Sequence, residues 1–377
     1  MPVPLLDLTR ENQPLLAEIQ AAMQPVIEGS QFILGKVVSD FEQSAAEYFE
    51  LSPDDLALGV SSGTDAQLLA LMALEIDAGK EFICPPYTFF STAGVIARAG
   101  LKVKFVDIEP ETYNLDPSKL EDAISEETAG IMPVHLYGQL ADMTSIMEIA
   151  NRHDLPVIED ACQSMGARHK NIVSGNFGDF TSISFFPTKN LGAFGDAGML
   201  ISKRPDLREK AIRMRVHGMK DRYEHLEVGG NFRIDALQAA ILSVKLKYLP
   251  EWHEMRRKNA SYYAKNFADL KIEQNQLEQP IEKKDNWHIY NQYVVRVKEG
   301  KRDALKAHLD AAGIGNMIYY PTPLHTQPCF QYLGYKAGDF PVAEHACTEV
   351  LALPIHPFIT QDEIRQVCEA ISSFYKV

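Results

Sequence analysis

The chain has 377 residues, of which 46% are hydrophobic and 23% charged, a balance typical of a globular protein with a sizeable core. Its formal net charge of −14 argues against binding to nucleic acid or anionic membranes, which needs a cationic face, but allows a phosphorylated small molecule. Five scattered cysteines, no leader-like segment and no apolar run long enough to span a membrane predict a cytoplasmic protein.

Short apolar runs alternate with helical patterns as far as about residue 214. The strand-like runs cover residues 82–84, 103–106, 130–134, 157–158, 180–185 and 199–201, and the helical patterns cover 64–74, 91–99, 117–124, 144–152 and 208–214. This alternation predicts an α/β fold in which helices flank a mostly parallel central sheet. Ligands of such sheets bind beyond the carboxyl ends of the strands, so we expect functional residues directly after the strands.

The pattern changes near Pro250. Helical or strand-like segments around and beyond it cover residues 235–249, 252–267, 290–297 and 302–312. The sequence therefore predicts a large domain over residues 1–250, including the N-terminal segment, and a smaller C-terminal α+β domain over residues 251–377.

The first candidate site is Ser61-Ser62-Gly63-Thr64, where small hydroxyl residues and a glycine precede an apolar helical stretch. A helix N-terminus here would offer free N–H groups and the positive end of the helix dipole to a phosphate. An ordinary N-cap, in which Ser or Thr satisfies backbone donors, is the alternative interpretation.

The second candidate is Asp160, which follows an apolar run and should lie at the carboxyl end of a strand. A fixed carboxylate there can keep a heteroaromatic nitrogen protonated, because an adjacent anion favours the cationic form. A capping aspartate and a metal ligand are the alternatives. With no H-E-x-x-H motif and no close histidine pair, we expect no metal site.

The third candidate is Lys189, which follows a strand-like run and precedes the stretch GAFGDAGM. Desolvation lowers the pKa of a lysine and frees its amine as a nucleophile toward a carbonyl; a solvated surface lysine is the alternative. The glycines spell neither G-x-G-x-x-G nor a P-loop, so a dinucleotide or nucleoside triphosphate site lacks its signature. Together, a phosphate cradle, a carboxylate and a buried lysine are what pyridoxal 5'-phosphate (PLP) requires.

Several longer segments carry a resemblance to one family, among them SSGTDAQLLAL, PPYTFFSTAGVI, VIEDACQSMGA, SFFPTKNLGAFGDAGM, GGNFRIDALQAAIL and YYPTPLHTQP. Nearly end to end, the chain resembles the DegT/DnrJ/EryC1/StrS family of sugar-nucleotide aminotransferases. The resemblance implies the aspartate-aminotransferase-like fold (fold type I) and PLP as cofactor. It also implies a homodimer with active sites at the subunit interface, glutamate as amino donor and a keto sugar on a nucleoside diphosphate as acceptor.

Carried over residue by residue, the resemblance makes Lys189 the Schiff-base lysine that also acts as general base and acid. Asp160 becomes the aspartate that faces the pyridine nitrogen. The other cofactor contacts that it implies are Gly63, Thr64 and Ser184 at the phosphate, Phe89 stacked on the ring, Gln163 near the ring hydroxyl, and Asn231, which reaches the phosphate from the partner subunit. Without the resemblance, Phe89 reads as a core aromatic and Asn231 as a turn residue.

The segments YGQLADM and GDFPVAE are most similar to the branch of the family that aminates carbon 3. That branch includes enzymes acting on UDP-2-acetamido-3-keto-glucuronate and on dTDP-3-keto-6-deoxyhexoses. The expected substrate contacts are Arg233, Tyr319, Tyr320, His217 and His325. Arg233 could pair bidentately with a sugar carboxylate or serve as a structural arginine. Tyr319 departs from the family pattern, because several relatives have His-Tyr-Pro at this point.

Two other functions stay open: a PLP-dependent sugar dehydratase, and a non-catalytic sensor of the same fold. The sister dehydratases carry histidine in place of the lysine, so Lys189 argues against the first. The complete set of lysine, aspartate and stacking aromatic argues against the second, since a pure binder need not retain a nucleophile.

Overall fold

The computed structural model of the protein describes residues 2–376; Met1 and Val377, the outer bounds of the two predicted domains, lie outside the described residues. Its centre is one sheet with the strand order β3-β2-β4-β5-β8-β9-β1. The strands are β1 (Leu56–Val60), β2 (Glu81–Cys84), β3 (Lys102–Phe105), β4 (Thr128–Ile131), β5 (Ile158–Asp160), β8 (Phe180–Ser184) and β9 (Gly198–Ser202).

Most neighbouring strands of this sheet are parallel. β2 pairs in parallel with β3 and β4, and β5 pairs in parallel with β8. Parallel bridges from Ile131 to Val157 and from Val134 to Asp160 join β4 to β5. Only β9 runs antiparallel to its neighbours β8 and β1. The predicted α/β fold with a mostly parallel sheet is confirmed; β1 was not predicted.

Helices cover both faces of the sheet, because successive side chains of a strand point to opposite faces. Leu200 packs in one core cluster, with helices α4 (Gly63–Leu74), α5 (Ser91–Arg98) and α8 (Pro205–Met214). Its neighbours Met199 and Ile201 pack in another, with α2 (Leu16–Gly29), α3 (Lys36–Tyr48) and α9 (Ala236–Leu246). Helix α7 (Met143–Arg152) covers β2 and β4, while α6 (Leu120–Ala123) precedes β4.

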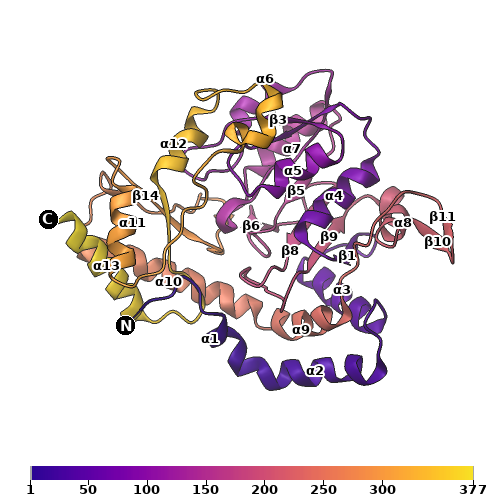
Figure 1. Ribbon diagram of the computed structural model, residues 1–377, viewed down its shortest axis with the longest axis horizontal. Helices are drawn as coiled ribbons and strands as arrows, with labels where there is room; N and C mark the ends of the chain where they lie inside the picture. The colour runs from indigo at the N-terminus through magenta and orange to yellow at the C-terminus, as the bar shows by residue number, and fades with distance from the viewer. Residues whose placement is uncertain (1, 377) are drawn as a thin grey trace.

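A second, antiparallel sheet, β12-β14-β15, forms the C-terminal part of the molecule. Its strands are β12 (Leu277–Glu278), β14 (Tyr293–Val297) and β15 (Val350–Leu353), and the helices there are α11 (Arg302–Ala311), α12 (Pro341–Glu349) and α13 (Gln361–Tyr375). The long helix α10 (Leu249–Asp269) joins the two parts (Figure 1). The chain start lies here too, since Val3 forms a parallel bridge with Ile314.

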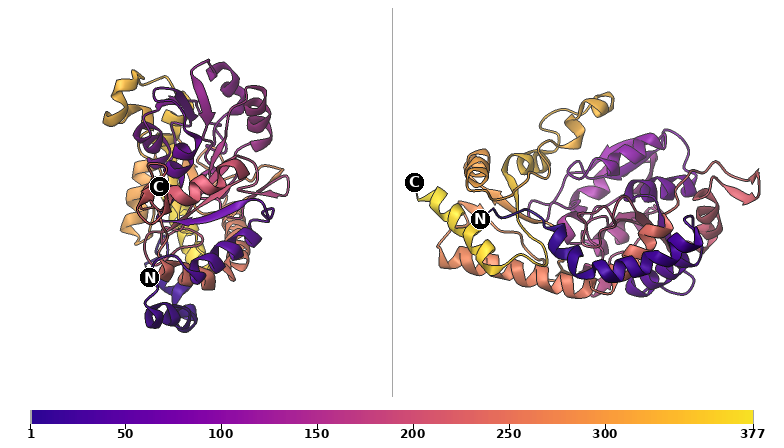
Figure 2. Two further views of the ribbon diagram at one scale, coloured as in Figure 1. Left: turned by 90° about the vertical axis from the view of Figure 1, so that its right-hand side faces the viewer. Right: turned by 60° about the horizontal axis from the view of Figure 1, so that its bottom comes forward.

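Short elements complete the fold. They are α1 (Leu8–Asn12), the pairs β6 (Arg168–His169) with β7 (Ile172–Val173) and β10 (Met219–Asp221) with β11 (Glu224–His225), and β13 (Asn286–Trp287), which pairs with β6. The β10–β11 hairpin projects from the body of the molecule (Figure 2). None of the helices between residues 2 and 376 combines the length and apolar character that a membrane span requires.

Candidate active site

Three of the predicted cofactor residues lie at the edge of the central sheet where the parallel strands end. Asp160 is the last residue of β5 and Ser184 the last of β8, while Gly63 opens α4 shortly after β1. Gly198 pairs with both Val60 and Ser184, so the ends of β1 and β8 meet at this edge. The sheet therefore gathers residues that are more than a hundred positions apart in the sequence.

Lys189 lies in the turn that follows β8, and its backbone N–H donates to the carbonyl of Phe186 at 2.9 Å. Its side chain is half-buried. Burial lowers the pKa of Lys189, and the nearby side chains of Cys162 and Asp160 oppose that shift. The amine is therefore more available as a nucleophile than that of a surface lysine, and its charge is within reach of the Asp160 carboxylate.

Asp160 is only 4% exposed, and both of its carboxylate oxygens are held. The hydroxyl of Thr92, in the first turn of α5, donates to Oδ2 at 2.7 Å, and the backbone N–H of Cys162 donates to Oδ1 at 3.2 Å. The strand itself is fixed by β4, since the Asp160 N–H donates to the carbonyl of Pro133 at 2.9 Å. These contacts fix the orientation of the carboxylate at the end of β5.

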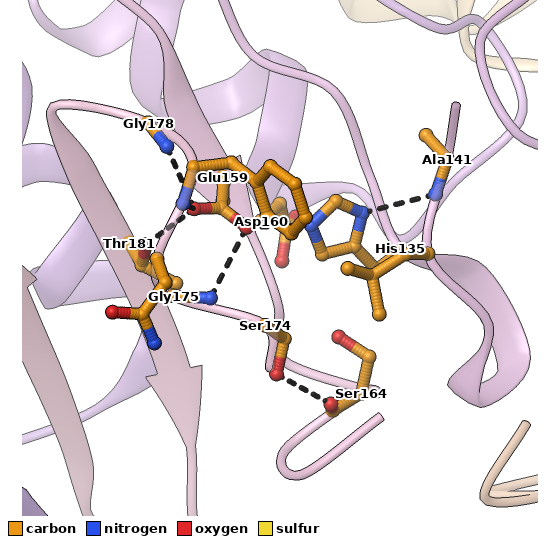
Figure 3. A network of polar contacts seen from close by, with 12 residues as sticks. His135, Ala141, Glu159, Asp160, Ser164, Ser174, Gly175, Gly178 and Thr181 are labelled. Atoms are coloured by element: carbon orange, nitrogen blue, oxygen red, sulfur yellow. Dashed lines mark hydrogen bonds and ion pairs between the residues drawn. The ribbon is translucent and has the colours of Figure 1, made fainter. Parts of the chain in front are cut away.

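The preceding residue, Glu159, points to the opposite face and centres a buried network (Figure 3). Glu159 and His135 are both 0% exposed, and His135 Nε2 lies 2.9 Å from Glu159 Oε2. The carboxylate also accepts hydrogen bonds from the N–H groups of Gly175, Phe177 and Gly178 and from the hydroxyl of Thr181, at 2.8–3.1 Å. Burial alone would raise the pKa of Glu159, but the hydrogen bonds from His135 and the backbone outweigh it and lower the pKa.

Replacing Glu159 by alanine should destabilise the fold by about 3–5 kcal/mol, because it leaves several buried donors without their acceptor. Since the folded-state pKa of Glu159 is lowered, its contribution is present above the unfolded value of about 4.3 and is lost as the pH falls. Denaturant unfolding at pH values above and below about 4.3 would measure both the loss of stability in the variant and its pH dependence. The exposed Glu121, paired with Arg152 and His153, gives a control, since Glu121→Ala should change stability little.

The N-terminus of α4 is the predicted phosphate site. Ser62 is the N-cap, its hydroxyl accepting the N–H of Asp65 at 3.0 Å, so the ordinary capping interpretation holds for this residue. Gly63 lies against the other strand ends: a Cβ there would be 2.8 Å from Cys162 Sγ and 2.8 Å from Ser184 Cβ. Thr64 and Ser184 are half-buried beside it. Only a residue without a side chain lets the N-terminus of α4 approach Cys162 and Ser184 this closely. A phosphate bound at the end of β8 would therefore lie next to a helix N-terminus.

A Gly63→Ala substitution should lower the affinity for PLP about 5- to 150-fold, because overpacking of a filled space costs about 1–3 kcal/mol and each 1.4 kcal/mol is tenfold in affinity. Titration of the apoprotein with PLP, followed by absorbance, measures this change. Gly29→Ala is the control, since a Cβ at Gly29 meets only Gln31 Cγ at 4.0 Å. Equal affinities of the two variants for PLP would show that the cofactor does not bind beside Gly63.

Gln163, Phe89 and Tyr320 lie together beside this edge. The Gln163 side chain accepts the N–H of Tyr137 at 2.8 Å and donates to the hydroxyl of Tyr320 at 3.1 Å. The Phe89 ring is 57% exposed, and its centroid lies 6.4 Å from that of Tyr320. An exposed ring at a strand end is available to stack on a flat cofactor.

A cluster of tyrosines that the sequence did not reveal fixes the segment of Tyr319 and Tyr320. The hydroxyls of Tyr87 and Tyr137 both donate to the carbonyl of Tyr319, the former at 2.6 Å. Tyr319 and Lys189 line one pocket, so the structure brings this predicted substrate contact to the lysine. Burial raises the pKa of Tyr320, which keeps its hydroxyl neutral.

The other predicted substrate and partner contacts do not lie together. Arg233 pairs with Val60, at the end of β1, and its Nε is buried with no hydrogen-bond partner among the described residues. Asn231 and His217 are exposed, the latter just before the β10–β11 hairpin. His325 is not brought to the Lys189 pocket: it is 1% exposed, its Nε2 lies 3.1 Å from Glu344, and its ring packs on Phe340.

Comparison with known proteins identifies the family. The DegT/DnrJ/EryC1/StrS aminotransferase family matches residues 14–372. A pleiotropic regulatory protein of Geobacillus stearothermophilus is 45% identical over 100% of this chain and 99% of its own. UDP-2-acetamido-2-deoxy-3-oxo-D-glucuronate aminotransferase of Pseudomonas aeruginosa is 37% identical over 98% of this chain and 100% of its own.

Solved structures support the same family assignment. DesV of S. venezuelae, solved in complex with a ketimine intermediate, superposes with a TM-score of 0.94 at 35% identity over 100% of this chain and 99% of its own. The predictions of family, fold type and cofactor are thereby confirmed. The chain belongs to the DegT/DnrJ/EryC1/StrS family and is a PLP-dependent aminotransferase.

Proposed function

We propose that this aminotransferase moves an amino group from glutamate to carbon 3 of a keto sugar on a nucleoside diphosphate. The amino sugar so formed serves glycan or natural-product biosynthesis. Relatives at 36–38% identity are named for UDP-linked or dTDP-linked sugars that carry the oxo or amino group at carbon 3, which supports this position. The observation that carries the proposal is the meeting of Lys189, Asp160 and the Gly63 cradle at one edge of the sheet.

In this proposal PLP, when bound, supplies an electron sink for the carbon that exchanges a proton. Lys189 holds the cofactor and then moves that proton, since its half-buried amine has a lowered pKa. Asp160 keeps the ring nitrogen protonated. Gly63, Thr64 and Ser184 bind the phosphate, Phe89 stacks on the ring, and Gln163 faces the ring hydroxyl.

The proposal includes a homodimer in the cytoplasm, in which Asn231 reaches the phosphate of the partner subunit's site. Large apolar side chains that are exposed in the single chain support it. They include Phe32 (44%), Phe186 (49%), Phe194 (42%), Tyr223 (82%) and Val228 (85%). Exposed apolar patches of this kind mark interfaces. A monomer in analytical ultracentrifugation with full transaminase activity would overturn this part.

The large domain, up to about residue 250, then carries the cofactor, and the smaller C-terminal domain contributes Tyr319 and Tyr320 to the substrate side. Arg233 is the proposed contact to a charged group of the sugar, because its guanidinium is partly unpaired beside Val60. His217, on the exposed hairpin base, is proposed to meet the substrate across the dimer. His325 is buried and packs on Phe340, so we do not propose that it contacts the substrate directly.

The test is a turnover screen by mass spectrometry, with glutamate and keto sugar nucleotides that either carry a carboxylate, such as UDP-2-acetamido-3-keto-glucuronate, or lack one. We expect a gain of one amino group on the sugar and one equivalent of 2-oxoglutarate. Loss of ammonia or water from the sugar without 2-oxoglutarate would instead identify a dehydratase. No reaction with any amino donor would favour a sensor.

A further inference from the structure

A buried carboxylate, Glu11, lies among buried cations of two other helices. Glu11 of α1 is 3% exposed, and its Oε1 lies 3.0 Å from Nζ of Lys245, a residue of α9 that is 1% exposed. Arg256 of α10 is 2% exposed and forms no ion pair within residues 2–376. Burial lowers the pKa of Arg256 to about 10, and the charge of Glu11 opposes that shift. Glu11, Lys245 and Arg256 are called the charge cluster below.

Each cation of the charge cluster holds a backbone carbonyl near Lys189. Lys245 Nζ donates to the carbonyl of Gly192, in the turn that carries Lys189, at 2.7 Å. Arg256 Nη1 donates to the carbonyls of Tyr290 and Ile355 at 3.2 and 3.1 Å. The pocket of Lys189 is lined by Asn291, Gln292 and Ile355. The two cations of the cluster therefore hold three segments that are remote in sequence and that each contribute residues to the pocket of Lys189.

The N-terminal segment before Glu11 forms a further wall of this pocket, through Leu5 and Leu6. It is anchored at its start, where the Gly315 N–H donates to the carbonyl of Val3 at 2.7 Å. It is anchored again beyond Leu6, where Arg10 binds both carboxylate oxygens of Glu363 at 2.8 Å. Glu11 adds the link from this segment to the turn that carries Lys189.

We propose that Glu11 is a positioning residue for transamination, which through Lys245 and Arg256 holds the walls around Lys189 without touching the cofactor. This rests on the proposed role of Lys189. The physical reason is the cost of the alternative. Without Glu11, Lys245 is a buried cation with no ion-pair partner, and Arg256 loses the more distant charge that offsets its burial, so each must shift or draw in water. Either response moves the carbonyls that they hold.

The test compares Glu11→Gln with Glu18→Gln. Both remove one carboxylate from the N-terminal region, but Glu18 forms a surface pair with Lys247 at 2.8 Å and the hydroxyl of Tyr248 at 2.9 Å. Hydrogen–deuterium exchange of the apoproteins is followed in peptides covering residues 186–194, 289–293 and 353–357. We expect faster exchange in these peptides in Glu11→Gln alone, because several of their amides are hydrogen-bonded, such as those of Lys189 and Ala193.

In the holoenzyme we expect kcat for the glutamate half-reaction to fall about a hundredfold in Glu11→Gln, since a shift of about 1 Å at a reacting group costs this much. The PLP affinity should fall much less than the rate, because Gly63 and Asp160, which are not held by the charge cluster, still contribute to binding of the cofactor. Unchanged exchange in the three segments, or a loss of PLP affinity as large as the loss of kcat, would overturn the proposal.

If the single variant unfolds, a double variant, Glu11→Gln with Lys245→Met, tests whether Glu11 acts on the rate or on stability alone. Replacing both members of a buried ion pair by uncharged residues is often tolerated. We expect it to fold and to keep the slow half-reaction, because Gly192 has lost its donor. Restored kcat would mean that Glu11 serves stability alone. If the wild-type enzyme does not react with glutamate, the proposed function is wrong. Hydrogen–deuterium exchange of the apoprotein tests the role of Glu11 independently of that activity.

Discussion

Lys189→Ala is expected to abolish transamination, slowing the glutamate half-reaction by about 10²–10⁴-fold or more, the usual contribution of a positioned general base or acid. The variant also loses the amine that holds the cofactor, so its visible absorption should differ from that of the wild type. Rapid mixing of each holoenzyme with glutamate, followed by absorbance, gives both results. Lys258→Ala, on the exposed face of α10, is the matched control and should react like the wild type.

The pH dependence of cofactor capture gives an independent check on the same amine. A lysine reacts with an aldehyde in its deprotonated form, and the pKa of Lys189 is lowered by burial. The rate at which the apoprotein takes up PLP should therefore rise with pH and level off below about 10.4, the ordinary pKa of lysine. A rate that keeps rising through that value, or wild-type turnover in Lys189→Ala, would refute the assignment.

Much of the fold follows from local sequence patterns. The strand ends before Asp160 and Lys189 are marked by short apolar runs, and α4 and α5 by apolar stretches, so the edge that carries the site was predictable. The helices α2 and α3 were not predicted. Helix α2 contains Pro25, which reads as a helix breaker, and both helices obtain their support from packing on α9, which only the folded chain shows.

The parts of the site that escaped prediction are pairs of residues that are distant in sequence. Glu159 with His135 and Glu11 with Lys245 look like ordinary charged residues, and only the structure reveals that they are buried together. The tyrosines that hold Tyr319 are similarly separated along the chain. Burial of a polar group is a tertiary property, whereas Lys189 and Asp160 were found because a strand end is a local signal.

The second large effect is expected for Asp160→Asn. The substitution keeps the size of the side chain, and Thr92 and the Cys162 N–H remain within hydrogen-bond distance, so the fold should survive. It removes the negative charge that favours a protonated ring nitrogen, and so weakens the electron sink on which proton transfer depends.

Removing one charge from a buried, hydrogen-bonded charge pair costs about 2–5 kcal/mol, and each 1.4 kcal/mol is tenfold in rate. We therefore expect Asp160→Asn to slow the glutamate half-reaction by about 30-fold to several thousandfold, measured by rapid mixing at saturating glutamate. PLP should still bind, through the Gly63 cradle and Lys189, so titration separates a loss of binding from a loss of rate. Asp122→Asn, on the exposed face of α6, controls for the removal of a carboxylate elsewhere. A wild-type rate in Asp160→Asn would mean that this carboxylate only binds the Thr92 hydroxyl and the Cys162 N–H and does not act on the ring.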